Sequence, residues 1–331
     1  MCAFFAKLLN VPTEPEPRSF NDPIFLIGSM RSGTTLLMNS LSEHPQILKI
    51  GFELNKVWTE IGGAPVHNGC LERTEKHFNV KYANNMTAYF SDYLNKSKSF
   101  IRKLSRYSQQ RYYGSGGVNY DWEKIYLMNK SPHLSNKVRY IHSLYPACKF
   151  IVVVRSPFAQ CASLKMKFLK SLKEENRYRF LSEQAGVCWQ GFQGDRLAEF
   201  PKERVFPGNF DLLVEAWLDI NYTMLKHLEH IPNDQKVILA YESIVQDNKE
   251  SMNRIFKTLD LKKEHRNYEQ KIITKERKIH NTSTSGNPLS KWKKHLDGSE
   301  QEVISTFLEK EKEKFEFIKN AVPMAANYWQ L

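Results

Sequence analysis

The segment from Ile24 to Leu41 constrains this chain more than any other part of its sequence. Ile24 to Ile27 is a short, wholly apolar run, which predicts a strand buried inside a parallel sheet. Gly28 and Gly33 bracket the turn after it, and an apolar stretch with helical spacing opens at Thr34. A strand, a glycine-containing loop and a helix start place free backbone N–H groups and the positive end of a helix dipole around an anion. The segment therefore predicts a site for a phosphate-like group.

The loop comes close to a Walker A motif, and its departure from that motif is informative. Gly28 and Gly33 have the G-x-x-x-x-G spacing, but Thr34 and Thr35 stand where Lys and Ser or Thr should follow. The basic residue is Arg31, inside the loop. Such a loop can hold one anionic group, but it lacks the Lys that a nucleoside triphosphatase uses. The alternative is an ordinary strand–turn–helix with a solvated Arg31.

Two further apolar runs end in basic residues. Residues 125–128 predict a strand that ends near Lys130, and residues 150–154 predict the clearest strand of the chain, which ends at Arg155. Ligands of open α/β sheets bind at such strand ends. Ser163 stands eight residues after Arg155, in the helix predicted to follow. An Arg fork and a hydroxyl suit a terminal phosphomonoester. The alternative for Lys130 is a surface lysine.

These segments resemble the sulfotransferases that use 3′-phosphoadenosine 5′-phosphosulfate (PAPS). Gly-Ser-Met-Arg-Ser-Gly-Thr-Thr, from Gly28 to Thr35, is similar to their 5′-phosphosulfate-binding loop, and Arg155 with Ser163 is similar to their 3′-phosphate-binding motif. The resemblance implies an α/β, three-layer, P-loop-like fold with a central parallel sheet flanked by helices, plus helical insertions over the acceptor site. It also implies PAPS as co-substrate, adenosine 3′,5′-bisphosphate (PAP) as product and no metal. The cofactor-binding residues that it implies are Ser29, Met30, Arg31, Ser32, Gly33, Thr34, Thr35, Arg155, Ser163, Tyr241 and Lys291.

The catalytic residues that the resemblance implies are Glu53, Arg31 and Lys130. The tyrosylprotein sulfotransferases, the most similar branch, carry a Gly-Glu-Glu segment whose second Glu is the base. Aligning Gly51 with that segment places Glu53 on the base and Phe52 on the first Glu. Lys130 matches a Lys-x-Pro segment whose Lys contacts the sulfuryl group. Many cytosolic relatives use His instead, but His44 lies so near a predicted helix end that a structural role is favoured.

The resemblance also reaches the later part of the chain. It places Tyr241 near the cofactor and gives Glu242 a bracing role. The stretch Leu289–Trp292 is similar to one in the family, and through it Lys291 is expected to contact a cofactor phosphate. One hydroxyl among residues 282–285 is expected to reach the sulfuryl site, and which one stays open.

Length and composition predict one large α/β domain, since the chain has 331 residues, 41% of them hydrophobic. We expect an extended N-terminal lead-in over residues 1–22 and a single sulfotransferase domain over residues 23–331. Insertions are expected at about 56–120 and 170–210. The second is expected to cover the acceptor site, although a structural excursion or an oligomer contact is an alternative. Residues 300–319 predict one charged, solvated terminal helix.

The formal net charge of +12 favours an anionic partner. A polyanionic co-substrate explains it best, because the basic residues are scattered and no nucleic-acid-binding motif is present. The five cysteines are odd in number and far apart, which predicts reduced thiols in a cytosol. The apolar patch at residues 1–9 is too short to span a bilayer. We therefore expect a cytoplasmic protein without stable membrane insertion.

The sequence thus predicts sulfuryl transfer from PAPS to a hydroxyl or amine, by in-line displacement with Glu53 as base. One rival is a P-loop nucleotide kinase or other phosphotransferase, against which the missing Walker Lys argues. Another is a nucleotide-binding module without turnover. A small-molecule metabolite is the favoured acceptor, with a glycan or a peptide tyrosine as alternatives. A homodimer is compatible with the sequence.

Overall fold

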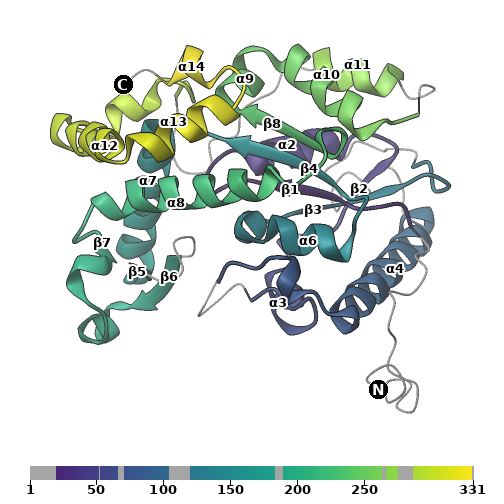
Figure 1. Cartoon of the computed structure of the whole chain (residues 1–331), viewed down its shortest axis with the longest axis horizontal. Helices are drawn as coiled ribbons and strands as arrows, with labels where there is room; N and C mark the ends of the chain where they lie inside the picture. The colour runs from purple at the N-terminus through teal and green to yellow at the C-terminus, as the bar shows by residue number, and fades with distance from the viewer. Residues whose placement is uncertain are drawn as a thin grey trace.

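A central parallel sheet organises the molecule. The computed structural model describes residues 20–51, 53–65, 71–103, 120–182, 189–262, 266–274 and 286–329. Within them the predicted three-layer α/β fold is confirmed: five parallel strands in the order β2-β3-β1-β4-β8 lie between two layers of helices (Figure 1). The strands are β1 (Ile24–Ile27), β2 (Ile47–Lys49), β3 (Tyr126–Lys130), β4 (Lys149–Val154) and β8 (Lys236–Ala240).

Alternate residues of each strand face opposite layers. Phe25 and Ile27 of β1 belong to one apolar cluster and Ile24 and Leu26 to the other, as the period of two in a strand requires. Both faces are therefore buried, which explains why β1 is apolar at every position. The first face is covered mainly by α3 (Asn55–Glu60), α4 (Val80–Lys103), α6 (Val138–Leu144), α7 (Pro157–Glu175) and α8 (Asp211–Leu228). The second is covered by α2 (Thr34–Leu41), α9 (Tyr241–Gln246), α10 (Asn248–Leu259) and α11 (Arg266–Thr274).

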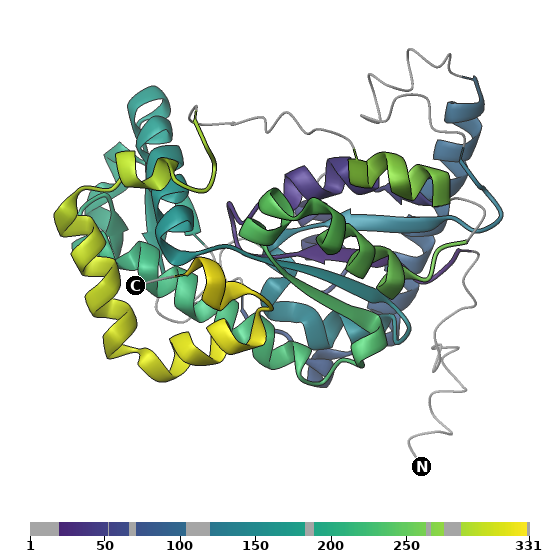
Figure 2. The same cartoon turned by 90° about the horizontal axis from the view of Figure 1, so that it is seen from above.

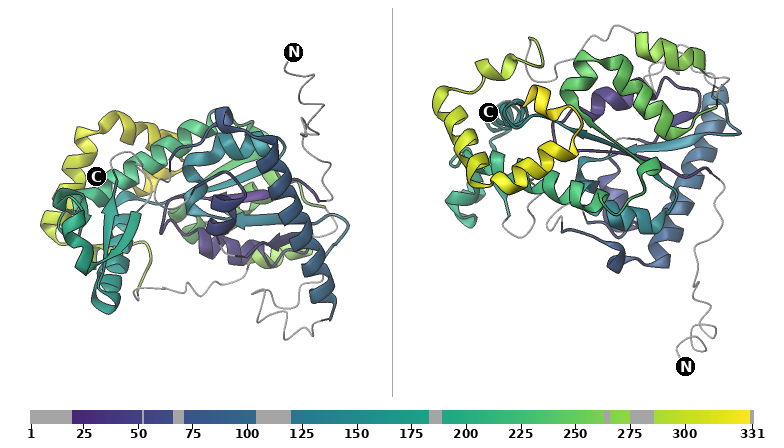
Figure 3. Two further views of the ribbon diagram at one scale, coloured as in Figure 1. Left: turned by 90° about the horizontal axis from the view of Figure 1, so that it is seen from below. Right: turned by 45° about the horizontal axis from the view of Figure 1, so that its top comes forward.

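A second, antiparallel sheet occupies the region expected to be a largely helical insertion. Its strands are ordered β6-β5-β7, with β5 pairing to both neighbours. This small sheet lies at the opposite end of the molecule from α4 (Figure 3). The arrowheads of β4 and β8 point toward the same end, so the sheet stands near the carboxyl ends of the central strands (Figure 1). The strands are β5 (Arg177–Leu181), β6 (Trp189–Gln193) and β7 (Val205–Phe206).

The prediction of a single solvated helix over residues 300–319 is wrong. The structure has two helices, α12 (Gly298–Lys310) and α13 (Lys312–Ala321), which follow one another around the end of the molecule (Figure 2). Each helix has an apolar stripe among its charged residues, and both helices pack against α8. A short helix, α14 (Ala325–Tyr328), ends the described chain. The buried stripe residues are Ile304, Leu308, Phe315 and Ile318.

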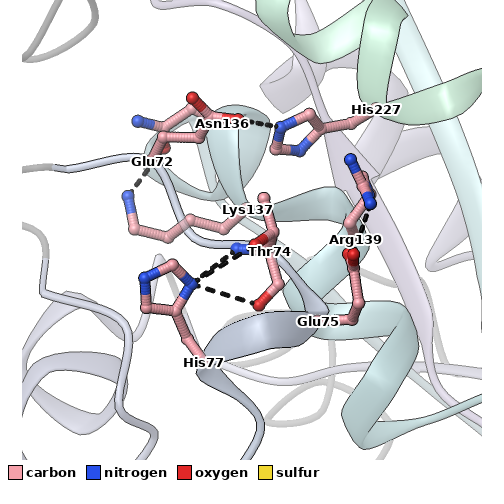
Figure 4. A network of polar contacts seen from close by, with 8 residues as sticks. All are labelled: Glu72, Thr74, Glu75, His77, Asn136, Lys137, Arg139 and His227. Atoms are coloured by element: carbon pink, nitrogen blue, oxygen red, sulfur yellow. Dashed lines mark hydrogen bonds and ion pairs between the residues drawn. The ribbon is translucent and has the colours of Figure 1, made fainter.

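A polar network fastens the 3₁₀ helix η2 (Pro132–Lys137), which follows β3, to its surroundings (Figure 4). Lys137 is buried, and its Nζ donates to the Asn136 side-chain oxygen at 2.7 Å and to the His133 carbonyl at 3.2 Å. Burial, together with the charge of Arg73, lowers the pKa of Lys137 to about 7. Nearby, His227 Nε2 lies 2.6 Å from a carboxylate oxygen of Glu72. The Arg73 N–H donates to the Asn136 carbonyl at 3.2 Å, which ties the end of η2 to the segment that precedes η1 (Glu75–His77).

Candidate active site

The loop after β1 has the backbone that a close anion approach requires. Arg31 adopts a left-handed φ of 70° and Gly33 one of 104°. Gly33 is the N-cap of α2, and no side chain caps the first turn of that helix. A Cβ on Gly33 would lie 2.3 Å from the Tyr241 ring, so this position combines a strained dihedral angle with a close contact. The N–H of Gly28 donates to Ser135 Oγ at 3.2 Å, which ties the loop to η2.

Arg155 joins this loop to two later parts of the chain. It follows β4 and is only 5% exposed. Its Nη1 donates to the Arg31 carbonyl at 3.2 Å and its Nη2 to the Pro288 carbonyl at 3.1 Å. The guanidinium lies over the Tyr241 ring, 4.5 Å from the ring centroid. Arg155, Tyr241 and the loop are therefore in contact.

Several cations crowd around the loop. Burial lowers the pKa of Arg31, and the charge of Arg155 lowers it further. The pKa of Lys291 is lowered first by burial and then by Arg155 and Arg31, and that of Lys167 first by burial and then by Arg31. Ser163 Oγ accepts from Arg31 Nε at 3.1 Å, so the structure pairs Ser163 with Arg31. Like charges this close to one another favour an anion among them.

Two buried polar atoms of this cluster have no hydrogen-bond partner among the described residues. They are Ser32 Oγ and Arg155 Nε. A buried donor or acceptor without a partner is costly, and a phosphate or sulfonate oxygen would satisfy each of these. The loop, the cations and the two atoms thus fit the anionic end groups of a nucleotide such as PAPS.

Glu53 and Lys130 meet at the edge of this cluster, although 77 positions separate them in the chain. Lys130 ends β3, and its Nζ lies 2.8 Å from Glu53 Oε1. Glu53 Oε2 accepts from Asn55 at 3.3 Å. Burial alone would raise the pKa of Glu53, but Lys130, His133 and Asn55 outweigh burial and hold that pKa below its ordinary value. The carboxyl is therefore ionised at neutral pH and able to accept a proton.

Contacts between α3 and β3 explain how this pair forms. Trp58 Nε1 donates to the Asn129 side chain at 3.0 Å, and Ser131 Oγ donates to Asn55 Oδ1 at 3.5 Å. Glu53 immediately precedes α3, whose N-cap Leu54 has a left-handed φ of 54°. The fixed position of α3 on β3 therefore turns the Glu53 carboxyl toward Lys130.

Sequence reasoning missed three polar residues near the site. His133 Nε2 lies 3.8 Å from Glu53 Oε2, and Gln160 Nε2 donates to Ser29 Oγ at 2.6 Å. Lys167 is the third. Gln160 is a lone amide within an apolar stretch of α7, and Lys167 follows Ser163 by one helical turn, so helical spacing could have indicated both. His133 follows Lys130 within the same segment.

The other residues predicted for the site differ in their burial and their contacts. Ser29 and Thr34 are buried, Met30 is half-buried, and Thr35 is exposed. His44 is buried beside Phe256, in keeping with a structural role. Glu242 accepts from the Ser156 N–H and from Trp329 Nε1, which matches its expected bracing role. The hydroxyls of residues 282–285 and Phe52 lie outside the described residues.

Three wider observations complete the description. Cys148 and Cys161 are free, buried thiols, and the other three cysteines are outside the described residues. Among the side chains that the structure describes, no group of three or more His, Cys, Asp and Glu is arranged to hold a metal ion. No helix within the described ranges has the length and apolar character needed to cross a membrane.

A comparison with models of known families shows the family of this chain. A model described as "Sulfotransferase family" matches residues 23–215, which is more than half of the chain. The nodulation protein NoeE of Sinorhizobium fredii is 28% identical over 144 residues, which are 43% of this chain and only 30% of that protein.

Solved structures with a similar course of the chain carry related descriptions. The sulfotransferase domain of the Synechococcus PCC 7002 olefin synthase is 15% identical and has a TM-score of 0.45, over 89% of this chain and 97% of that one. A sulfotransferase from Alicyclobacillus acidocaldarius is 12% identical with a TM-score of 0.46, over 90% and 95% of the two chains. Mouse sulfotransferase SULT7A1 complexed with PAP is 13% identical with a TM-score of 0.42, over 92% and 90%.

Proposed function

This chain belongs to the sulfotransferase family, and from that premise we propose that it transfers the sulfuryl group of PAPS to a hydroxyl or amine of an acceptor molecule. The observation that carries the proposal is the buried cation cluster around the loop after β1, with Ser32 Oγ and Arg155 Nε lacking partners among the described residues. Such a cluster suits a ligand with an anion at each end, as PAPS has.

The residues divide into a binding set and a reacting set. Arg31, the loop N–H groups and Ser32 would hold the phosphosulfate end. Arg155 would hold the 3′-phosphate, and Lys291 would add a charge to the same region. Bound PAPS supplies an activated sulfuryl group. Ser163 would position Arg31, to which it is hydrogen-bonded.

In the proposed reaction, the acceptor oxygen forms a bond to sulfur while the bond from sulfur to the phosphate oxygen breaks. Glu53 receives the acceptor proton, because its carboxyl is held ionised. Lys130 lies 2.8 Å from that carboxyl and, together with Arg31, would offset the negative charge that develops on the leaving phosphate. PAP and the sulfated acceptor are the products.

Calorimetric titration with PAP, in the presence of a chelator, tests this function. We expect binding to the wild type and a loss of at least tenfold in affinity for Arg155→Ala, because a buried, charged hydrogen-bond donor is removed. Arg254→Ala is the control, since Arg254 also donates to a backbone carbonyl, but it lies on α10 and is half-buried. Binding of ATP that requires magnesium, with no binding of PAP in chelator, would favour a phosphotransferase instead. Binding indifferent to Arg155 would refute the proposed site.

A further inference from the structure

The outer edge of β8 presents main-chain groups that a further strand could pair with. β8 ends the strand order of the central sheet and pairs with β4 on one side, and no described strand lies on its other side. Arg254 Nη2, on α10, donates to the Ile238 carbonyl at 3.1 Å, so that carbonyl faces away from β4. In an extended strand the N–H of a residue faces the same way as its carbonyl. The edge therefore carries outward N–H and C=O groups.

A groove runs along this edge. Residues 236–238 of β8 line it, together with residues 254, 257 and 258 of α10, residue 233 of the 3₁₀ helix η5 (Asn233–Gln235) and residues 321 and 323 around the end of α13. Its space is about 680 Å³, including the part open to solvent. The groove starts at the amino end of β8, whereas Tyr241 of the candidate active site follows the carboxyl end. The groove is therefore separate from that site.

The charged side chains that line the groove are all cationic. They are Lys236, Arg254 and Lys257, and none of the described residues in the lining is Asp or Glu. Lys236 Nζ donates to the carbonyls of Leu228 at 2.6 Å and Ile231 at 2.8 Å. Arg254 and the exposed Lys257 are therefore the cations that a ligand in the groove would meet.

These charges decide which strand the edge can take. Cations along an edge keep it from pairing indiscriminately, because they repel a strand that does not neutralise them. A second copy of this chain is a poor partner, because the chain has a net charge of +12 and a two-fold axis would bring the same cations together. An extended segment that carries carboxylates would pair main chain with main chain and neutralise Arg254 and Lys257.

We propose that the outer edge of β8 is a docking site for an acidic, extended segment of a partner protein, which adds to the central sheet as a sixth strand. Its main chain pairs with β8 at Ile238, and its carboxylates lie against Arg254 and Lys257. This interaction goes beyond the proposed sulfuryl transfer and does not depend on it.

Fluorescence anisotropy with labelled peptides and the full chain tests the docking. The probe is the peptide Glu-Val-Glu-Val-Glu-Val, and Lys-Val-Lys-Val-Lys-Val is its basic counterpart with the same alternation. We expect saturable binding of the acidic peptide that weakens as salt is added, and at least tenfold weaker binding of the basic peptide. Absence of binding by the acidic peptide, or equal binding of the two, would overturn the inference.

N-methylated peptides separate strand addition from simple charge attraction. Successive residues of a strand point their N–H groups to opposite edges, so methylation of the Val nitrogens blocks one edge of the acidic peptide and methylation of the Glu nitrogens blocks the other. Strand addition uses one edge. One methylated peptide should therefore bind at least tenfold more weakly than the other, because it loses several main-chain hydrogen bonds. Equal affinity of the two would rule out strand addition.

Two charge reversals on α10 test the place of docking. Lys257→Glu should weaken binding of the acidic peptide about fivefold, because a cation of the groove becomes an anion. Lys249→Glu is the matched control, since Lys249 is an exposed lysine of the same helix that does not line the groove. Equal peptide affinity in the two variants would contradict the assignment.

Two further measurements keep the outcomes apart. Sedimentation shows whether the chain self-associates without peptide, and a dimer that Ile238→Pro abolishes would assign the edge to a second copy and overturn the inference. Calorimetry with PAP reports on the other end of the sheet, where Lys257→Glu should have the affinity of the wild type. Failure of the wild type to bind PAP would refute the proposed function and leave the peptide result standing.

Discussion

Several charged side chains lie close together in the candidate site. Burial and then the charge of Arg155 lower the pKa of Arg31, and burial followed by the charges of Arg155 and Arg31 lowers the pKa of Lys291, so the site is electrostatically unfavourable without an anion. Glu53 carries the opposite charge, and the ammonium of Lys130, 2.8 Å away, offsets it. In the proposed reaction the same Lys130 would also offset the developing charge of the leaving group, so the Glu53–Lys130 ion pair would loosen as Glu53 takes up a proton. The two residues would then act as a coupled pair.

Glu53→Gln tests the residue assigned as base. The amide keeps the size of the side chain but cannot accept the proton, so we expect kcat to fall by about 10²- to 10⁴-fold. PAP affinity measured by calorimetry should stay near that of the wild type. Glu60→Gln, an exposed change on α3, is the control and should leave kcat unchanged. A Glu53→Gln protein with normal turnover would show that another group takes the proton.

At the scale of elements, the unit of β1, loop and α2 depends on contacts made by a distant helix. Tyr241, at the start of α9, packs against Gly33 and under Arg155. The loop is therefore held by a residue more than two hundred positions later in the chain. The Gln160 and Ser135 contacts hold its other side.

Gly33→Ala tests this packing. A Cβ would lie 2.3 Å from the Tyr241 ring on a residue with a φ of 104°, so the loop must shift. We expect at least a tenfold loss of PAP affinity, because the N–H groups of the loop would no longer converge. Gly298→Ala is the matched control, since a Cβ there meets nothing within 4 Å. Equal PAP affinity in both variants would show that the loop geometry is not what binds the ligand.

Sequence patterns predicted the central sheet well because its strands are marked locally. β1, β4 and β8 are apolar runs rich in β-branched residues, and a strand buried on both faces requires that composition. β5 is not such an apolar run, because its sequence is Arg-Tyr-Arg-Phe-Leu. It pairs only with strands of the small sheet. Its fold depends on partners that local composition does not reveal.

The candidate site was predictable only in part, for a similar reason. Arg31 and Arg155 stand in motifs with fixed spacing, so sequence reasoning found them. The resemblance supplied Glu53 and Lys130, and the structure brings them within 2.8 Å. Gln160 is recognised only from its contact with Ser29, 131 positions away in the same chain. No spacing rule encodes such a contact.

At the scale of the whole molecule, buried Lys137 links stability to pH. Its folded-state pKa of about 7 lies below the ordinary value of 10.5, because burial and Arg73 disfavour the charged form. Between these two values the unfolded chain binds more protons than the folded one, so stability from this group rises with pH. Below pH 7 the penalty of the buried charge is fully present.

Lys137→Met should remove that dependence. We expect the free energy of unfolding of the wild type, relative to the variant, to rise by on the order of 2 kcal/mol between pH 6 and pH 9. Urea midpoints across that range measure it. Lys56→Met, on a lysine whose side chain is 83% exposed, is the control and should parallel the wild type. Parallel curves for Lys137→Met and the wild type would mean that Lys137 does not titrate in this window.

The strand order also bears on how the molecule is made. β1 is synthesised before its neighbours β3 and β4, which follow about a hundred residues later. At the usual pace of translation, about 5 to 20 residues per second, β1 waits roughly 6 to 25 seconds for both partners. Its wholly apolar sequence is exposed during that wait, and the long loop closures slow its pairing. A nascent chain that has not yet released Val154 from the ribosome therefore lacks the anion site, however complete the loop itself is.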